Sequence, residues 1–177
     1  MAKNSMKQIQ EDEKKILKEL QKNANKSINE IAKKCKFSRQ KVWRIIKNLE
    51  KNNTIWGYMA VTDEEKLNMQ GYVVLIKRSN QPLAKELIDK IIERNIEEDL
   101  EELNAEIISS SYTNGIFDWV ICFRATDIKG AKRFCESLNK LFEGYIQEIY
   151  LLEKMFPVKK CGIPNPEINK LSDFFNL

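Results

Sequence analysis

The sequence contains no histidine, and this absence removes much catalytic chemistry. An imidazole is the commonest general base in enzymes, a frequent metal ligand and a member of most catalytic triads. The four cysteines are widely separated and include no Cys-x-x-Cys pair, so neither a zinc site nor a disulfide framework is indicated. We therefore expect no metal, no cofactor and no enzymatic activity.

Long apolar runs are also missing. No stretch of the 177 residues approaches the ~20 apolar residues that a membrane-spanning helix needs. The polar start MAKNSMKQIQEDEKK lacks the apolar core of a signal peptide. We expect a soluble, cytoplasmic protein without a membrane partner. The acidic run from Glu97 to Glu102 has no turn glycine and no calcium-loop spacing, so it predicts a solvated surface.

The charges that are present are unevenly distributed. Residues 1–56 hold 15 Lys and Arg against 6 Asp and Glu, a net charge of +9, whereas residues 57–177 hold 15 against 20, a net charge of −5. A basic region joined to an acidic one indicates nucleic acid as the partner of the first and another role for the second.

Residues 27–52 have the pattern of two helices joined by a short turn. Ser27 and Glu30 form a capping box that begins the first of them. In the second, Val42, Ile45 and Leu49 belong to an apolar stripe at helical spacing. The opposite face is basic and polar. This pattern predicts a helix-turn-helix with residues 38–51 as the recognition helix.

The polar face of that helix supplies the predicted DNA contacts. Arginine and glutamine hydrogen-bond base edges, whereas lysine pairs with phosphate. The residues predicted near base edges are Ser38, Arg39, Gln40, Trp43 and Arg44, and those predicted on phosphates are Lys41, Lys47 and Lys36. Trp43 could equally pack against the first helix. A face that is merely solvated is the alternative for the whole set.

The flanking elements are predicted from their periodicity. A helix over residues 11–22 precedes the capping box, a strand over 55–61 follows the recognition helix, and residues 62–70 form a polar connection. Beyond these, strands and helices alternate. The predicted ranges are strand 72–76, helix 82–95, strand 107–112, strand 117–125, helix 128–141 and strand 145–156.

The order β-α-β-β-α-β predicts a ferredoxin-like domain, so the fold class is α+β. We expect a helix-turn-helix domain over residues 1–54, a hinge strand and linker over 55–70, a ferredoxin-like domain for oligomerisation and ligand sensing over 71–160, and a tail over 161–177.

Three motifs in this arrangement resemble those of one family. DEKKILKELQKNAN at residues 12–25 is similar to D-x-x-I-L-x-x-L-Q-x-(D/N)-(A/G), Ile55-x-Gly57-Tyr58-x-Ala60 to a hinge strand I-x-G-Y-x-A, and Gly115-x-x-Asp118 to a loop G-D-x-D. In this order they resemble the leucine-responsive regulatory protein/AsnC (Lrp/AsnC) family of prokaryotic transcription regulators, over about residues 7–160.

The resemblance implies a regulator of double-stranded DNA whose C-terminal, ACT-like RAM domain dimerises through its sheet. Dimers would assemble into tetramers or octamers, and a small-molecule effector would bind near Thr113, Asn114, Gly115 and Asp118. Two departures stand out. Lys36 replaces the usual turn glycine, and Ile116 replaces the first acidic residue of the loop. Because an amino-acid ammonium needs a carboxylate, Ile116 argues against a free amino acid.

Two other functions remain open at this point. An architectural DNA-binding protein without an effector would share the basic helix. Siroheme decarboxylases resemble the same two-domain family, and Tyr112, Arg124 and Arg133 could hold an anionic substrate, but no histidine is present to act on it.

Overall fold

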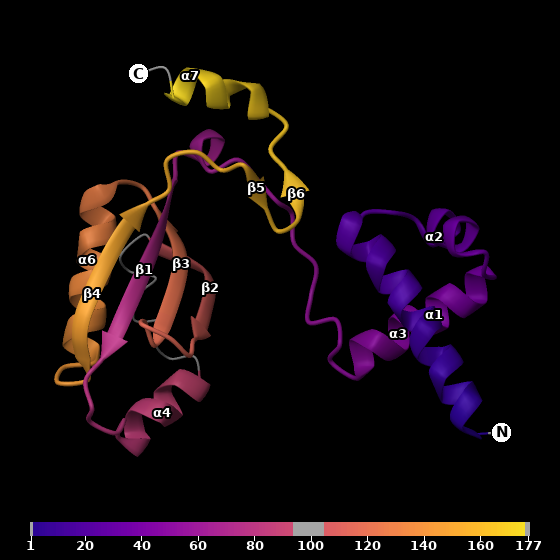
Figure 1. Ribbon diagram of the computed structural model, residues 1–177, viewed down its shortest axis with the longest axis horizontal. Helices are drawn as coiled ribbons and strands as arrows, with labels where there is room; N and C mark the ends of the chain where they lie inside the picture. The colour runs from indigo at the N-terminus through magenta and orange to yellow at the C-terminus, as the bar shows by residue number, and fades with distance from the viewer. Residues whose placement is uncertain (1, 94–104, 176–177) are drawn as a thin grey trace. The chain divides into compact units, whose positions relative to one another are not determined.

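The computed structural model describes residues 2–93 and 105–175. The predicted acidic run and the end of the helix predicted over 82–95 lie outside these residues. The chain forms two compact units, one made of residues 1–61 and 158–177 and the other of residues 62–157. Figure 1 labels the elements of each. Residues 2–61 are called the helical unit and residues 62–157 the sheet unit.

The helical unit contains α1 (Ala2–Lys22), α2 (Ile28–Cys35) and α3 (Arg39–Lys51). Apolar residues at helical spacing bury one stripe of each helix against the other two. The buried core consists of Ile16, Leu20, Ile31, Ala32, Val42, Ile45 and Leu49. The predicted helix-turn-helix and its recognition helix are therefore confirmed as structure.

Helix α1 is longer than predicted, because it begins at Ala2 and not at Glu11. The added residues include alanine, lysine, methionine and glutamine, which favour helix, and no glycine or proline. Two apolar residues of this extension, Met6 and Ile9, do not pack on the core, because they are 65% and 54% exposed. Hydrophobic periodicity identifies helical turns that pack on a core. It therefore did not predict the turns around Met6 and Ile9.

The capping box predicted at Ser27 and Glu30 is present. Ser27 Oγ accepts a hydrogen bond from the Glu30 backbone N–H, and the Glu30 carboxylate accepts one of 2.8 Å from the Ser27 N–H. Lys36 ends α2 in the left-handed region with φ 57° and ψ 44°. A non-glycine residue there carries a cost of roughly 1–2 kcal/mol. The turn thus keeps the geometry of a glycine turn while using lysine.

The strand predicted over residues 55–61 is wrong for the described chain, which has no strand there. Trp56 is 95% exposed, and Met59 is 64% exposed. A strand is stabilised by hydrogen bonds to a neighbouring strand, and no described segment pairs with this one. Alternating apolar residues alone could not reveal whether a partner exists.

The sheet unit begins with a short 3₁₀ turn, η1 (Glu65–Leu67), and has a four-stranded antiparallel sheet in the order β2-β3-β1-β4. Its elements are β1 (Gln70–Arg78), α4 (Lys85–Ile92), β2 (Ala105–Tyr112), β3 (Trp119–Ala125), α6 (Ile128–Leu141) and β4 (Ile146–Glu153). This is the predicted ferredoxin-like order. Asp127 caps α6 by accepting a bond of 2.7 Å from the Gly130 N–H.

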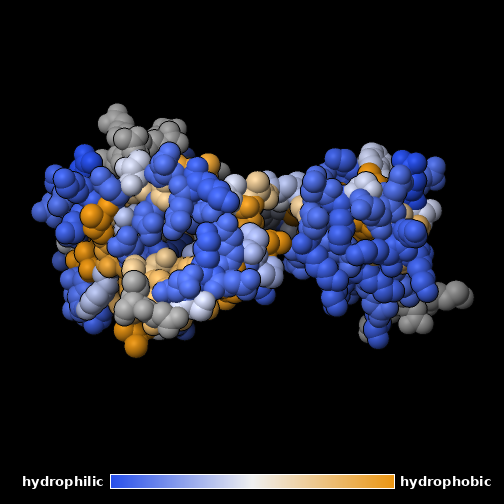
Figure 2. Space-filling model, turned by 90° about the horizontal axis from the view of Figure 1, so that it is seen from above, coloured by the Kyte–Doolittle hydropathy of each residue, from blue (hydrophilic) through white to orange (hydrophobic). Residues whose placement is uncertain are grey.

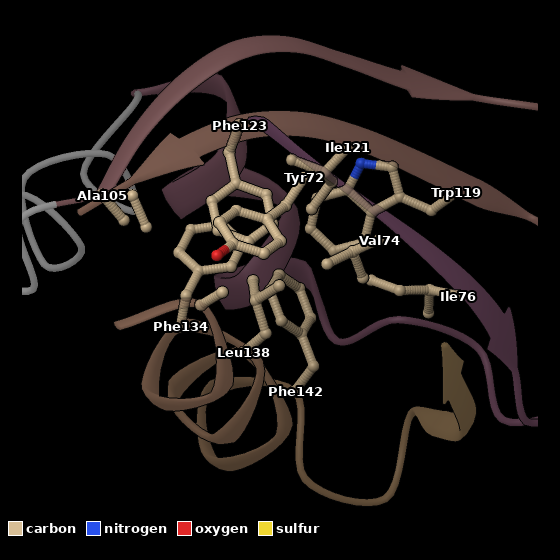
Figure 3. Close-up of a cluster of buried hydrophobic side chains, with 12 residues drawn as sticks. Tyr72, Val74, Ile76, Ala105, Trp119, Ile121, Phe123, Phe134, Leu138 and Phe142 are labelled. Carbon is tan, nitrogen blue, oxygen red and sulfur yellow. The ribbon is translucent and has the colours of Figure 1, made fainter. Parts of the chain in front are cut away.

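One face of this sheet packs on α6. In β1 and β3 every second side chain is buried, and these meet Phe134 and Leu138 of α6 and Phe142, the residue that follows α6 (Figure 3). The rings of Phe123 and Phe134 stack with centroids 4.2 Å apart. The core of the sheet unit is thus aromatic and lies between the sheet and α6.

The chain after residue 157 is short and irregular. It contains β5 (Lys159–Lys160), β6 (Ile163–Pro164), η2 (Ile168–Lys170) and α7 (Leu171–Phe175). Cys161 and Gly162, with φ of 46° and 82°, form the turn between the two strands. No helix of the described residues has the length and apolar character that crossing a membrane requires.

Candidate nucleic-acid interface

Helix α3 presents one side to the core and the other to solvent. Ser38 caps it, because its Oγ accepts a hydrogen bond of 3.2 Å from the Lys41 N–H. The cap orients the first turn, whose unpaired N–H groups and positive dipole end favour a phosphate nearby. The exposed predicted contacts are Ser38, Arg39, Gln40, Trp43, Arg44 and Lys47. Trp43 is 54% exposed, so its ring is available to solvent.

The guanidinium groups of Arg39 and Arg44 on this surface have no carboxylate partner among the described residues. An arginine that is free of an internal partner can present its planar fork to a guanine edge or a phosphate without first breaking a salt bridge. The exposed face of α3 is therefore chemically competent to bind DNA.

Lys41 differs from its neighbours because it points its ammonium inward. Its Nζ lies 2.5 Å from Asp12 Oδ2 and 4.2 Å from the centroid of the Phe37 ring. Asp12 is only 5% exposed, and its hydrogen bond from Lys41 lowers the pKa of its carboxyl. This ion pair joins α1 to the recognition helix. No sequence signal connects residues 29 positions apart, so the role of Lys41 on phosphate stays a prediction.

Lys47 also has a partner, but at the surface. Its Nζ lies 2.7 Å from Glu50 Oε2, and the hydroxyl of Tyr58 donates a bond of 3.1 Å to the other oxygen of the same carboxylate. Both the lysine and the tyrosine are exposed. An exposed pair of this kind contributes little stability, so a phosphate can compete for Lys47.

A second ion-pair network was not predicted from the sequence. Glu19 of α1 accepts bonds from Lys26 at 2.7 Å and from Lys22 at 3.0 Å, and Lys34 of α2 lies at 3.6 Å. The hydrogen bond from Lys26, followed by that from Lys22, lowers the pKa of Glu19 to about 2. These contacts join α1 to α2 and to the loop between them.

The predicted effector loop lies between β2 and β3 and is held by its own hydrogen bonds. Thr113 Oγ1 donates to the Phe117 carbonyl at 2.6 Å, and the Thr113 N–H donates to the Asp118 carbonyl at 2.8 Å. Asn114, Gly115 and Ile116 are exposed, the last at 80%. The loop therefore forms a closed turn with its tip in solvent.

The carboxylate of Asp118 accepts a backbone hydrogen bond. Its Oδ2 accepts a bond of 2.8 Å from the Arg78 N–H, and its own N–H donates to the Ile76 carbonyl at 2.9 Å. One of the two carboxylate oxygens thus helps to close the end of β1. A ligand ammonium would have to share a carboxylate that already has a structural bond.

The three residues considered for an anionic substrate are not gathered in one place. Arg124 pairs with Glu106 through two bonds of 2.7 Å at the start of β2, whereas Tyr112 ends that strand opposite Trp119. Arg133 lies on the exposed side of α6. The described structure therefore does not assemble these residues into a substrate site.

Comparison with known proteins identifies the N-terminal motif and the fold. Residues 13–55 match the family model described as winged helix-turn-helix DNA-binding. No curated protein sequence matches the chain. Among solved structures, an AsnC family transcriptional regulator from Agrobacterium tumefaciens is 23% identical with a TM-score of 0.64, and the match covers 84% of this chain and 92% of that one.

Two further structures share this fold. A transcriptional regulator from Neisseria meningitidis, solved as its L-Met complex, is 19% identical with a TM-score of 0.62, covering 84% of this chain and 91% of that one. AsnC of E. coli is 20% identical with a TM-score of 0.56, covering 85% and 94%. The chain thus has the two-domain fold of the Lrp/AsnC transcription regulators, with a helix-turn-helix DNA-binding domain at its N-terminal end.

Proposed function

We propose that the protein is a sequence-specific, DNA-binding transcription regulator of the cytoplasm that acts as a dimer or larger assembly. The observation that carries this proposal is the exposed face of α3, where Arg39 and Arg44 have no internal ion-pair partner among the described residues. It lies within the segment that matches the helix-turn-helix family model.

The contacts follow from the chemistry of the groove. The major groove admits an α-helix, and the N-terminal part of a recognition helix contacts base edges. That part of α3 carries Arg39, Gln40 and Arg44, which can fork onto guanine or adenine. Lys47 lies further along the helix and is suited to a phosphate. Ser38 and Trp43 are the other predicted base contacts. Lys41, whose ammonium pairs with Asp12, and Lys36 are the other predicted phosphate contacts.

A second copy of the chain is the proposed partner of the open sheet face. The side chains on this face of β1, β3 and β4 lie side by side in register and are half-buried or exposed; they include Val73, Leu75, Val120, Cys122, Tyr150 and Leu152. No described helix packs on them. An apolar patch of this kind is suited to an interface, and two helix-turn-helix units bind half-sites one helical turn apart.

An effector is the least constrained part of the proposal. The Neisseria regulator was solved with L-Met, and Thr113, Asn114, Gly115 and Asp118 are the corresponding candidates here. Ile116 offers no carboxylate, and Asp118 is bonded to the Arg78 N–H. We therefore propose an effector other than a free amino acid. The self-bonded loop equally favours the second candidate function, an architectural DNA-binding protein without an effector.

One binding experiment separates the two candidates. The affinity of the full chain for its own promoter would be compared with that for random DNA of the same length at physiological salt. A regulator should prefer its promoter by about 10³-fold or more, whereas an architectural protein should bind both about equally. Arg44→Ala should lower promoter binding by roughly 1–3 kcal/mol. Arg133→Ala, an exposed arginine of α6, is the matched control and should change nothing.

Sedimentation tests the assembly. The wild-type chain should sediment as a dimer or larger species. Leu75→Asp would place a charge on the open sheet face and should yield monomers that bind DNA far more weakly. Ile128→Asp, an exposed apolar residue at the start of α6, should leave the assembly intact. A monomeric wild-type protein would exclude the dimer.

A further inference from the structure

A small hollow opens at the end of the sheet where β1 and β2 finish. Its walls include Arg78, Leu83, Tyr112, Trp119, Phe142 and Tyr145. The hollow is shallow: the space along its walls is about 230 Å³, and most of that space is open to solvent. Apart from Arg78, the wall is aromatic and aliphatic. None of the residues of the predicted effector loop lines it.

Arg78 is the unexplained group in this hollow. Its Nε is buried and has no hydrogen-bond partner among the described residues, and the one side-chain bond that it makes to them is a long one of 3.4 Å from Nη2 to the Gln81 carbonyl. It forms no ion pair within the described chain. Buried donors are ordinarily satisfied, and a guanidinium carries five of them. The guanidinium of Arg78 therefore has donors that no acceptor of the described residues satisfies.

The backbone holds Arg78 in this position. The pairing of β1 with β4 shifts register between Lys77 and Arg78, and Asp118 Oδ2 accepts the Arg78 N–H at 2.8 Å. Lys77, the preceding residue, instead pairs with Glu148 at 3.2 Å. Asp118 thereby fixes the backbone of Arg78 while its carboxylate makes no ion pair with the guanidinium.

The aromatic wall is equally well defined. The rings of Tyr112 and Trp119 stack with centroids 5.3 Å apart, and Phe142 meets Trp119 edge-on at 5.2 Å. Tyr112 is half exposed, so one part of its ring faces solvent at the hollow. Burial raises the pKa of Tyr112, which keeps its hydroxyl protonated and able to donate.

We propose that this hollow binds a small organic monoanion, a carboxylate attached to an apolar or aromatic body, with Arg78 as its anchor. A carboxylate matches the planar fork of a guanidinium, and the apolar body matches the aromatic wall. A phosphate dianion fits less well, because Arg78 is the single cation among the described residues of the wall. The site adds to the proposed regulatory role but does not depend on DNA binding.

Calorimetry with the full-length chain tests the proposal. The probes are phenylacetate and two molecules of nearly the same shape, the neutral 2-phenylethanol and the cationic phenethylamine. Phenylacetate should bind one molecule per chain, at least about tenfold more tightly than the alcohol, because only the carboxylate can pair with Arg78. The amine should not bind.

Variants locate the binding. Arg78→Gln should weaken phenylacetate at least about tenfold, whereas Arg124→Gln, whose guanidinium is already paired with Glu106, should leave it unchanged. Leu83→Trp keeps Arg78 but fills the hollow, and it should also abolish binding. The melting curve of each variant shows whether it is folded, and Arg78→Lys, which keeps the charge without the fork, replaces Arg78→Gln if that variant is unfolded.

Three results would overturn the proposal. They are equal affinity for phenylacetate and the alcohol, unchanged binding by the folded Arg78 variant, and no heat from phenylacetate, benzoate or isovalerate up to about 10 mM, which corresponds to no useful affinity. Promoter binding measured on the same samples reports separately on the DNA-binding role, so failure of one does not imply failure of the other.

Discussion

In the helical unit, the helices are joined by side-chain ion pairs, Asp12 with Lys41 and Glu19 with Lys26, around a small aliphatic core. The sheet unit relies on backbone pairing and on stacked aromatic rings between the sheet and α6. Their surfaces differ as well: the face visible in Figure 2 is mostly hydrophilic over the helical unit and more often hydrophobic over the sheet unit. A polar, basic unit can remain solvated and meet a polyanion, whereas an apolar face is suited to being covered.

The largest effect is expected from the aromatic core. Phe134→Ala removes a fully buried ring stacked on Phe123 and should lower the free energy of unfolding of the sheet unit by about 3–5 kcal/mol. Denaturation followed by the fluorescence of Trp119, the one buried tryptophan of the described residues, measures it. Phe175→Ala, at a 75% exposed position, is the control and should change little. If the helical unit lost its structure at the same denaturant concentration, the two units would not be independent.

A smaller effect is expected from the two lysines of α3. Lys41→Ala leaves the buried Asp12 without its cation and should destabilise the helical unit by about 1–3 kcal/mol, less than for a fully buried pair because Lys41 is partly exposed. Lys47→Ala removes an exposed pair and should cost under about 1 kcal/mol.

Lys47→Ala is also expected to change DNA binding. Lys47→Ala should weaken binding to all sequences alike and reduce the salt slope by about one unit. Thermal melts and salt titrations of both variants provide the measurements. Equal melting temperatures for the two would contradict the distinction between an inward and an outward lysine.

Acid should affect the helical unit before the sheet unit. The folded pKa of Glu19 is lowered from its usual 4.5 to about 2, and that of Asp12 is also lowered, so their ion pairs stabilise the unit above about pH 5 and are lost as the pH falls toward 2. Circular dichroism of the helices between these pH values measures the loss. Glu19→Gln should flatten this dependence, whereas Glu11→Gln, an exposed carboxyl of the same helix, should not.

The smallest effect is expected at the turn before the recognition helix. Lys36→Gly relieves left-handed strain of roughly 1–2 kcal/mol but adds freedom to the unfolded chain, so a net gain below about 1 kcal/mol is expected. Asn68→Gly makes a similar change in the sheet unit, also at positive φ, where asparagine is already tolerated. It should gain less. A loss of stability at Lys36 would show that its side chain is needed.

Local patterns were enough to predict most elements of the fold. The Ser27 and Glu30 capping box and the apolar patterns of β1 and β3 are short-range signals, and each corresponds to an observed element. The prediction of a strand over residues 55–61 was wrong because a strand depends on a long-range contact. Pairing requires a partner, which a local pattern cannot supply.

The candidate sites were predictable only in part. The exposed face of α3 follows from helical periodicity, but the Asp12 to Lys41 ion pair does not, because it joins distant positions whose residue types are common on surfaces. Arg78 was not singled out either. At the end of a strand it looks like any solvated arginine, and only the fold shows that its Nε is buried beside an aromatic wall.

The carboxylate of Glu50, shared between Lys47 and the hydroxyl of Tyr58, couples two neighbouring segments. The hydrogen bond from Lys47 is the largest cause of the lowered pKa of Glu50. The pKa of Tyr58 is raised, first by burial and second by its hydrogen bond to Glu50. A phosphate that takes Lys47 removes that cation. The pKa of Glu50 then rises, so DNA binding near that pKa is accompanied by proton uptake. Tyr58, eight positions after Glu50, would thus respond to DNA bound at Lys47 through the carboxylate that the two residues share.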